Sequence, residues 1–486
     1  MEAAKWVDKV RINPGNYADS KKFAIREYTD DQYAAELNRI RERFAPLVEL
    51  SKKRGIAMRI GTNHGSLSDR IMNRYGDTPL GMVESALEFA RIARDLDYHA
   101  FIFSMKSSNP KVMIAAYRLL VARLGELGPD WNYPVHLGVT EAGEGEDARI
   151  KSAIGIGSLL ADGIGDTIRV SLTEDSPHEI PVARALVAMI STPNAQRSTL
   201  NAELSFDPFS YQRRATETIE RDGVRLGGEE LIRVVTSRQK FEQVAHKIDK
   251  LGDYKPEIVY ENASVVEIDP RDEAAIAKIN SEREAQLVTA SDVVDLAVIP
   301  AFRLLASRLA PRHPILLKDV FSRENGEREF LQTLLTASTN IGSLLCDGIG
   351  DAILVRGEEA PGQSLRLSYN ILQAAGSRIF KTDYVACPSC GRTLFNLQTT
   401  TAKIKAATSH LKGVKIAIMG CIVNGPGEMA DADFGYVGGA PGKVNLYVGK
   451  TAVKFNIPEA EAVDRLKDLI REHGKWVEPA VEPAAA

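Results

Sequence analysis

An eleven-residue segment occurs twice in this chain, and the repeat constrains the fold more than any other feature. Residues 156–166 read IGSLLADGIGD and residues 341–351 read IGSLLCDGIGD, so ten of eleven positions agree. Long matches within one chain indicate related structural units. We therefore expect two helix–turn–strand units, each of which closes a barrel-like domain. The copies then diverge, because Arg169 and Ser171 follow the first copy, whereas the second copy lacks this Arg and this Ser.

Short apolar runs alternate with amphipathic stretches from residue 1 to about residue 175. This pattern is typical of strand–helix units around a parallel sheet. The apolar runs predict five strands, at residues 9–12, 57–60, 100–103, 135–139 and 167–170. Helices are expected at 82–96 and 112–124. Because the first predicted strand begins almost at residue 1, we expect a (β/α) barrel that is incomplete at its N-terminal side.

Composition and charge exclude several classes of protein. The chain has 486 residues, a net charge of -4 and no basic stripe with interleaved aromatic residues, so no nucleic-acid partner is expected. No apolar run approaches the roughly 20 residues that cross a bilayer, and the first ten residues lack a signal-peptide core. We therefore expect no membrane association and a cytoplasmic location. Four cysteines are too few for a disulfide scaffold of this length.

Three of the four cysteines lie in two motifs near the C-terminus. Cys387 and Cys390 form a C-x-x-C pair just before a predicted helix (394–411), whose N-terminal dipole is expected to favour thiolates. Alone, this pair fits a thioredoxin-like redox site, half a zinc site, part of an iron–sulfur site or a chance occurrence. Cys421 lies in a second motif, GCIVNGPGE, after a predicted strand. Cys346, inside the second repeat, is expected to be a buried structural cysteine.

Glu428 ends the second motif and is the candidate fourth ligand. Three thiolates and one carboxylate fit a cubane cluster with one labile iron better than structural zinc, which prefers closed Cys/His sets. A carboxylate is a harder and more exchangeable ligand for iron than a thiolate, so a substrate oxygen is able to replace it. If this motif stood alone, the simpler interpretation would be that Glu428 is an exposed residue of a loop. We predict a [4Fe-4S] cluster on Cys387, Cys390, Cys421 and Glu428.

Polar side chains follow the predicted strands, where a (β/α) barrel carries its active site. They are Arg11, Arg59, Asn63, Lys106, Glu141, Arg169 and Ser171. Cationic groups that converge with the backbone amides of glycine-rich turns suit a diphosphate. A single arginine at a strand end is usually a surface ion pair, but four cations in register on successive strands indicate a site. We expect His64 and His136 to make local hydrogen bonds.

At these residues the chain resembles the 4-hydroxy-3-methylbut-2-en-1-yl diphosphate synthase family of the methylerythritol phosphate route to isoprenoids, in its long three-domain form. The segments RINPGN, MRIGTNHGSLSDRI, CPSCGRTLF and MGCIVNGPGE carry the resemblance, together with residues 138–172. It implies an oxidoreductase that converts 2-C-methyl-D-erythritol 2,4-cyclodiphosphate to 4-hydroxy-3-methylbut-2-enyl diphosphate, with ferredoxin or flavodoxin as electron donor. It also implies a cytoplasmic location, or the plastid stroma for a plant or algal protein.

The resemblance assigns roles to the candidate residues. Arg11, Arg59, Asn63, Lys106, Arg169 and Ser171 are implied to bind the diphosphate. Glu141 is implied to be the proton donor, and Glu428 is implied to leave the cluster when substrate binds. The implied domains are a partial TIM-type barrel (1–199), a degenerate barrel-like spacer (200–375), an α+β sulfite-reductase-like [4Fe-4S] domain (376–476) and a disordered tail (477–486).

One departure from the family pattern concerns the first barrel. Such a barrel has eight strands, and the sequence predicts five, so about three strand–helix units are expected to be absent. The expected result is an exposed apolar edge that favours aggregation. A truncated gene model, a fragment and a real variant remain open, as do a monomer and a homodimer. The alternative functions are an inactive form of this enzyme, an iron–sulfur reductase of the sulfite or nitrite type, and a zinc or redox module.

Overall fold

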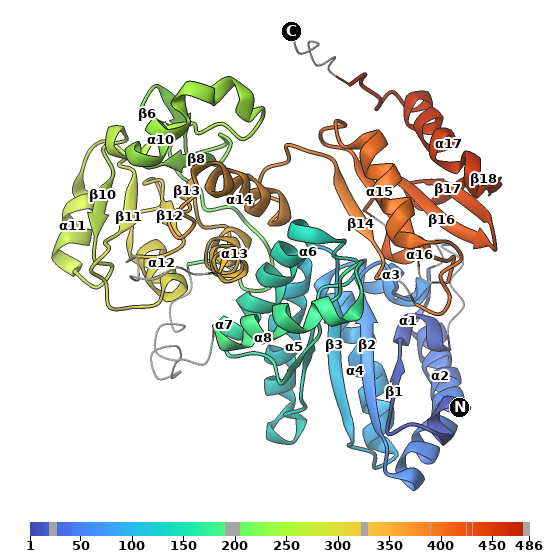
Figure 1. Ribbon diagram of the computed structural model, residues 1–486. Coiled ribbons are helices and arrows are strands. Elements are labelled where there is room, and N and C mark those ends of the chain that lie inside the picture. The colour runs from blue at the N-terminus through green and yellow to red at the C-terminus, as the bar shows by residue number, and fades with distance from the viewer. Residues whose placement is uncertain are drawn as a thin grey trace.

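The computed structural model describes residues 1–18, 27–189, 205–321, 329–388, 390–423, 425–429 and 431–479. Within these ranges the paired strands fall into three chain segments, which begin at Lys9, Ile219 and Asp383. Figure 1 shows them as a first unit in blue to green, an inserted unit in yellow-green to brown, and a C-terminal unit in orange and red. The C-terminal unit packs on the first unit, and helix α13 of the inserted unit lies against both α6 and α7 of the first.

The first unit contains the five strands that the sequence predicts. They are β1 (Lys9–Ile12), β2 (Ala57–Asn63), β3 (Phe101–Lys106), β4 (His136–Leu137) and β5 (Thr167–Ile168). Each is parallel to the next, with β3 joined to β4 through a bridge between Phe103 and Val135. This order is that of consecutive strands in a (β/α) barrel. The carboxyl ends of the five strands therefore lie on one side of the unit.

Helices cover the outside of this sheet. They are α1 (Pro14–Tyr17), α2 (Asp30–Arg54), α3 (Asp69–Tyr75), α4 (Pro79–Asp95), α5 (Pro110–Leu127), α6 (Gly145–Ser152), α7 (Ser158–Ala161) and α8 (Glu179–Ala188), with the short turns η1 (Ala3–Lys5), η2 (Pro129–Trp131) and η4 (Ser176–His178). The predicted helices at 82–96 and 112–124 are confirmed as α4 and α5. The sequence pattern alone did not identify α2, which begins at a capping box formed by Thr29 and Gln32.

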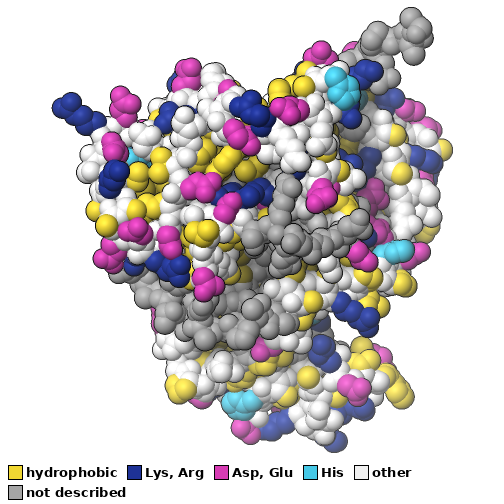
Figure 2. Space-filling model, turned by 60° about the vertical axis from the view of Figure 1, so that its left-hand side comes forward, with side chains coloured by type: hydrophobic (Ala, Val, Ile, Leu, Met, Phe, Trp, Pro, Cys, Tyr) yellow, Lys and Arg dark blue, Asp and Glu magenta, His cyan; other side chains and the backbone are white. Residues whose placement is uncertain are grey.

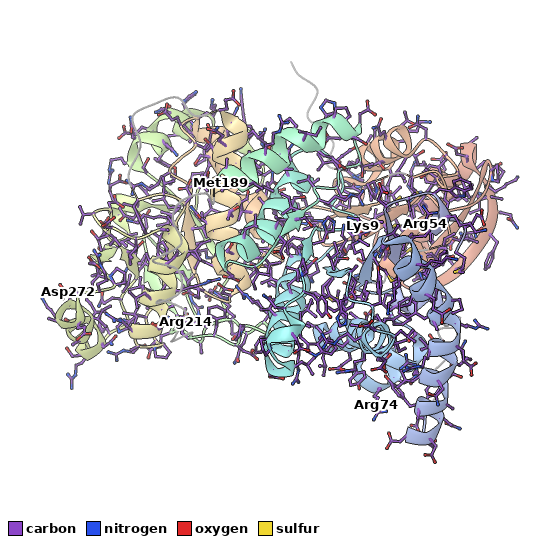
Figure 3. All side chains as sticks on the ribbon, turned by 90° about the horizontal axis from the view of Figure 1, so that it is seen from below. Lys9, Arg54, Arg74, Met189, Arg214 and Asp272 are labelled. Carbon is purple, nitrogen blue, oxygen red and sulfur yellow. The ribbon has the colours of Figure 1, made fainter. Side chains whose placement is uncertain are left out.

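Strand β1 is the edge of the sheet in the described part of the chain. Lys9 is exposed at the start of this strand, whereas Ile12 at its end is buried. A charged side chain on an edge disfavours pairing with another chain, and the expected aggregation stays a prediction. Trp6, just before the strand, is 80% exposed and provides apolar surface beside it. Figure 3 places Lys9 near Arg54, the last residue of α2.

The inserted unit is built around six parallel strands. They are β8 (Arg233–Thr236), β9 (Ile258–Val259), β10 (Val266–Ile268), β11 (Val288–Ala290), β12 (Leu316–Lys318) and β13 (Ala352–Leu354). In the described residues the pairings run β10-β11-β12-β13-β8-β9. The pair β13-β8 joins the last of these strands along the chain to the first, as in a barrel. Figure 2 shows a face of this unit on which Lys, Arg, Asp and Glu side chains are interspersed.

Its helices follow these strands, and a hairpin precedes them. The hairpin is β6 (Ile219–Arg221) with β7 (Val224–Leu226), and the helices are α10 (Arg238–Val244), α11 (Glu273–Ser281), α12 (Val298–Arg308), α13 (Phe330–Cys346) and α14 (Pro361–Ala374), with the turns η6 (Ala245–Leu251) and η7 (Tyr260–Asn262). Seen from below in Figure 3, Arg214 and Asp272 mark this unit, opposite Arg74 of the first unit.

The two copies of the repeat pack against each other. Each forms a helix, a turn and a strand, as predicted, and the first copy contains a π-helical turn, η3 (Ala153–Gly157). Ser158 and Ser343, which occupy the same place in the two copies, share a hydrogen bond of 2.6 Å. Gly157 and Gly342 also correspond, and each allows close approach because a Cβ there would lie 2.4 Å from the other unit. The contact is therefore nearly two-fold symmetric.

A ring of four buried charges continues this symmetry. Arg118 bonds Asp162 and Asp347 at 2.8 Å each, and Arg303 bonds the same two carboxylates at 2.7 and 2.8 Å. Asp162 corresponds to Asp347 in the repeat, and Arg118 corresponds to Arg303, since AAYRLLVARL (115–124) matches PAFRLLASRL (300–309) at six positions. The sequence repeat therefore extends into α5 and α12. Cys346 is buried beside this ring, as predicted, and burial raises the pKa of its thiol to about 12.

The C-terminal unit has one mixed sheet in the order β14-β15-β16-β17-β18. The strands are β14 (Asp383–Ala386), β15 (Lys415–Met419), β16 (Phe434–Ala440), β17 (Lys443–Val448) and β18 (Thr451–Pro458), and the helices are α15 (Leu397–Thr408), α16 (Gly425–Glu428) and α17 (Glu459–Glu472). The first three strands are parallel and the last two pairings are antiparallel. The predicted strand before Cys421 is confirmed as β15. Residues 480–486 of the predicted tail lie outside the described residues.

Candidate active site

A cavity of about 180 Å³ lies between the first unit and the C-terminal unit. The carboxyl ends of the barrel strands form one wall, and the loops that follow β14 and β15 form the other. Its lining residues are Arg11, Arg59, Asn63, Lys106, Thr140, Glu141, Arg169, Cys387, Pro388, Cys390, Arg392, Met419, Gly420, Cys421, Gly425 and Glu428. Nearly all the predicted site residues therefore meet in one place, within a single chain.

The barrel wall concentrates positive charge. Arg11 donates to the carbonyl of Gly61 at 3.0 Å and to Oδ1 of Asn63 at 2.9 Å, so its guanidinium is fixed at the end of β2. Burial lowers the pKa of Arg59 to about 10, and the nearby Arg11 adds to this effect. Burial and the like charges of Arg169, Arg59 and Arg11 lower the pKa of Lys106 well below its ordinary value. These cations repel one another, and a multiply charged anion would relieve that repulsion.

Glu141 is the buried acid of this cavity. Only 4% of the residue is exposed, and its Oε2 atom has no hydrogen-bond partner among the described residues. Burial, followed by the neighbouring charge of Glu428, raises the pKa of Glu141 well above its ordinary value. The backbone has a φ of 48°, a conformation that costs free energy in a residue with a side chain. The strained turn directs this carboxyl group into the cavity, and its raised pKa favours the neutral form.

The cysteine wall begins at the end of β14. Cys387 follows the last residue of this strand, and its Sγ accepts a hydrogen bond of 3.2 Å from the backbone N–H of Gly420. Burial opposes ionisation of Cys390, but hydrogen bonds from Arg392 bring the pKa of its thiol below the ordinary value. Helix α15 begins at Leu397, three residues later than predicted, so residues 391–396 separate it from Cys390. The effect of its dipole on the thiols stays a prediction. All four cysteines lie in the described part of the chain, and none forms a disulfide.

Glu428 connects the two walls. It ends the short helix α16, and its Oε1 accepts a short hydrogen bond from Nδ2 of Asn63, at the end of β2. Within the described ranges, no three His, Cys, Asp or Glu side chains lie close enough to hold a single metal ion. The four predicted ligands instead surround the cavity, and one of their sulfur atoms already accepts a backbone hydrogen bond. A donor set of three thiols and one carboxylate around an open space fits a multi-iron cluster.

Backbone contacts hold the C-terminal unit against the barrel. Ala142, which follows Glu141, forms a parallel β-bridge with Ala386, which precedes Cys387. The hydroxyl of Thr173 donates to the carbonyl of Cys387 at 3.1 Å. Glu141 and Cys387 are therefore the chain neighbours of the two residues that form this bridge, which fixes their backbones relative to each other.

Side-chain contacts reinforce this docking. Nζ of Lys151 lies 2.9 Å from Oδ1 of Asp383 at the start of β14. Nζ of Lys381 lies 2.7 Å from Oδ1 of Asp147, and Lys405 pairs with Glu144 at 2.9 Å. The acidic start of α6 is thus covered by lysines from the linker and from the C-terminal unit.

Comparison with known proteins identifies the chain. The family model described as the GcpE TIM-barrel domain matches residues 1–184, and the model described as the GcpE protein C-terminal domain matches residues 383–472. A relative from Akkermansia muciniphila is 58% identical over 99% of this chain and 82% of the relative. The chain belongs to the GcpE family.

Relatives with enzyme names come from bacteria and plants. The relative from Akkermansia muciniphila and one from Protochlamydia amoebophila are both named 4-hydroxy-3-methylbut-2-en-1-yl diphosphate synthase (flavodoxin). The second is 45% identical over 99% of this chain and 83% of its own length. A relative from Arabidopsis thaliana is 44% identical over 99% of this chain and 76% of its own length, and is named the ferredoxin, chloroplastic form. The family resemblance that the sequence motifs predicted is confirmed.

Ser171 differs from its expected place, whereas His64 and His136 do not. Ser171 is buried but does not line the cavity of this GcpE protein. Nε2 of His64 lies 3.2 Å from the carbonyl oxygen of Asp77, and Nδ1 of His136 lies 2.8 Å from the hydroxyl of Thr167, so both histidines make the predicted local contacts. Burial and nearby cations lower the pKa of His136 to about 3.

Arg392 also lines the cavity and was not predicted as a site residue. It comes two residues after Cys390, a predicted cluster ligand. Proximity to a motif was therefore an available signal. In the residues that the structure describes, none of the helices is both long and apolar enough to cross a membrane.

Proposed function

We propose that this protein is a 4-hydroxy-3-methylbut-2-en-1-yl diphosphate synthase that opens and reduces 2-C-methyl-D-erythritol 2,4-cyclodiphosphate. The observation that supports this function best is the single cavity, in which four barrel cations face three cysteines and a glutamate. Cations suit a diphosphate, and the cysteines suit a redox cluster. The names of the relatives agree with this chemistry.

The barrel wall is proposed to bind the diphosphate. Arg11, Arg59, Lys106 and Arg169 supply positive charge, and Asn63 fixes Arg11 through its side-chain oxygen. Arginine forms two parallel hydrogen bonds with phosphate oxygens, which orients the anion as well as binding it. Repulsion among these cations in the protein without substrate favours a ligand with several negative charges. Ser171 is proposed to support this wall from outside the cavity.

Cys387, Cys390, Cys421 and Glu428 are proposed to hold a [4Fe-4S] cluster. When bound, such a cluster passes single electrons, which a reaction that needs two electrons receives in succession. The fourth ligand is the one that the barrel already contacts, through the hydrogen bond from Asn63 to Glu428. Binding of substrate near Asn63 therefore acts directly on the most exchangeable ligand.

Glu141 is proposed to be the proton donor. The reaction releases a hydroxyl group as water, and this step needs a proton. A general acid must carry its proton at the working pH, and burial raises the pKa of Glu141, which favours that form. The docked C-terminal unit also limits the access of water to the cavity, which protects reactive intermediates.

We infer that the inserted unit is a degenerate second barrel with a supporting role. Strand register places Leu354 where the first unit has Arg169, and Ser291 where it has Lys106. The inserted unit has two cations, Lys318 and Arg356, at positions where the first unit has none. Each pairs with Asp292 at 2.6 Å. Its charges therefore neutralise each other, which leaves little attraction for a diphosphate.

Flavodoxin and ferredoxin are the proposed electron donors, because the relatives' names include one or the other. A cytoplasmic location is proposed for a bacterial source and the plastid stroma for a plant source. Because the face around Ser158 already packs on the inserted unit, a homodimer would have to form through another surface. The same domain boundaries, 1–199, 200–375 and 376–476, are proposed for the enzyme.

The decisive experiment combines cluster analysis and turnover. Anaerobically purified protein is expected to contain iron and acid-labile sulfide, and to convert the cyclic diphosphate when dithionite-reduced viologen supplies electrons. Equimolar zinc without sulfide would contradict the cluster, and a cluster without turnover of the cyclic diphosphate would contradict the substrate. A signal from bound sirohaem would instead indicate a sulfite-type reductase.

A further inference from the structure

Arg392 belongs to a loop whose backbone is fixed beside the cysteines. The backbone N–H of Cys390 donates to the hydroxyl of Thr393 at 3.0 Å, and that of Leu394 donates to the carbonyl of Gly420 at 3.0 Å. Thr393 packs so closely on Gly420 that a Cβ at that glycine would lie 2.8 Å from the threonine hydroxyl. The loop therefore presents the side chain of Arg392 to the cavity from a constrained position.

Arg392 and Arg11 line the cavity from opposite walls. Arg392 also has the smallest effect among the charges that lower the pKa of Arg11, after the larger effects of burial and of Arg169. Arg392 follows Cys390 by two residues and lowers the pKa of its thiol, which places Arg392 on the side of the predicted cluster. The barrel supplies the other cations from the opposite wall. An anion between the two walls would therefore be contacted from both units.

We propose that Arg392 contacts the substrate's diphosphate from the C-terminal unit and stabilises the negative charge that develops on this group during the reaction. This inference rests on the proposed function. It assigns to the C-terminal unit a direct part in anion binding, in addition to its part in electron transfer.

The charge change follows from the chemistry of the step. The bond between a ring carbon and a diphosphate oxygen breaks, and its electron pair stays on the oxygen. Two electrons from flavodoxin or ferredoxin go to that carbon, which expels the neighbouring hydroxyl and forms a carbon–carbon double bond. The hydroxyl takes one proton, which Glu141 is proposed to supply, and leaves as water. The diphosphate thus changes from two negative charges to three.

The position of Arg392 suits the new charge better than the positions of the barrel cations do. The carbon that receives electrons must lie on the side of the cysteines, and the released oxygen was bonded to this carbon. Arg392, which lines the cavity from the loop that carries Cys390, is on that side, whereas Arg11 and Arg59 extend from β1 and β2 on the other. A donor placed where charge develops accelerates a reaction more than one that binds the ground state.

The test compares R392Q and R392K with the native holoenzyme, and uses R465Q as a control. Arg465 lies on α17 of the same unit and pairs with Glu461 at 3.5 Å, and both side chains are 55% exposed. For R392Q we expect kcat to fall about 100-fold, as for loss of one oxyanion donor, while KM stays within about threefold. R392K should recover part of the loss, because it keeps the charge without the planar fork. R465Q should match the native enzyme.

A second readout does not depend on turnover. Inorganic pyrophosphate resembles the ring-opened diphosphate, which carries more negative charge than the cyclic diphosphate of the substrate. Its Kd, measured by calorimetry, should therefore rise about tenfold in R392Q. Unchanged kcat and Kd in R392Q would overturn the proposal. A changed cluster midpoint potential with an unchanged pyrophosphate Kd would also overturn it, because Arg392 would then act on the Cys390 thiolate. If Kd rises while the native protein fails to turn over the cyclic substrate, the anion contact stands and the proposed function fails.

Discussion

Glu141 illustrates how far individual residues were predictable. Its place after a predicted strand indicated a site residue, and the structure shows it lining the cavity. Its positive φ and its raised pKa depend on burial and on Glu428, which is far away in the sequence. The same holds for Arg392, because only the folded chain brings it near Arg11. The sequence pattern thus predicts where strands end, but it does not predict which side chains contact each other in the folded chain.

Replacement of Glu141 by glutamine tests its role as proton donor. The amide keeps the shape of the side chain but supplies no acidic proton, so kcat should fall about 100- to 10,000-fold. Substrate affinity should change little, because the cations provide most of the attraction. Single-turnover kinetics and a binding titration would separate the two effects. E126Q, at an exposed glutamate on α5, is the matched control and should be fully active.

Lys106 is expected to lower the stability of the folded protein and to strengthen substrate binding. Burial and three neighbouring arginines disfavour its charge, as its lowered pKa indicates. The substitution K106M should therefore leave the melting temperature equal or higher, since it removes a buried cation from like charges. Loss of a desolvated charge contact costs about 2–5 kcal/mol, so KM should rise at least about 30-fold. A lower melting temperature together with an unchanged KM would contradict this account.

At the scale of elements, the parallel strands were the most predictable part. All five strands of the first unit were identified, because buried parallel strands appear as short apolar runs. The helix α2 was missed because its hydrophobic face is narrow, with Ile40, Phe44 and Leu47 buried among many charged residues. The π-helical turn η3 was also missed, since nothing in the repeat distinguishes it from the continuous helix α13.

The contact between α6 and β14 depends on one ion pair. Burial opposes ionisation of Asp383, but Lys151 and Lys415 lower its pKa below the ordinary value. Its contribution to stability is therefore complete above the unfolded pKa, near 3.8, and is lost as the pH falls through the lower folded pKa. At pH 7, D383N should leave the mostly buried charge of Lys151 with only the carbonyl oxygen of Tyr384, at 3.4 Å, as a partner, and cost about 3–5 kcal/mol.

We expect D383N to lower both the melting temperature and kcat, because β14 leads directly to Cys387. Thermal unfolding and turnover at pH 7 are the measurements. The double variant K151M/D383L removes both charges and should recover most of the stability. If the single and double variants are equally destabilised, the ion pair is not what holds β14 to the barrel.

At the scale of the whole molecule, the repeat predicted two related units but not their arrangement. Equivalent residues, Ser158 and Ser343, meet at the interface, and equivalent Arg–Asp pairs form the buried ring around it. The sequence match alone was compatible with two separate domains. The interface depends on glycines and small polar residues that sequence patterns do not distinguish from ordinary helix residues.

This symmetry predicts the behaviour of a chain that lacks the inserted unit. Replacement of residues 200–375 by a short flexible linker would expose the face around Ser158 on the first unit. Because Asp162 and Arg118 are the counterparts of Asp347 and Arg303, a second copy is able to supply the same ring. We therefore expect the shortened chain to form a homodimer through this face, measured by analytical ultracentrifugation, whereas the full chain should not use it.

Substitution at the ring provides the control. In the shortened chain, D162N would remove both carboxylates of the symmetric ring, because each copy contributes the same residue, and the dimer should dissociate. In the full chain the same change removes one carboxylate of two, and Asp347 still bonds both Arg118 and Arg303. The full chain should therefore keep its fold and lose only part of its stability. A shortened chain that stays monomeric, or a dimer that D162N leaves intact, would show that the pairing depends on features specific to the inserted unit.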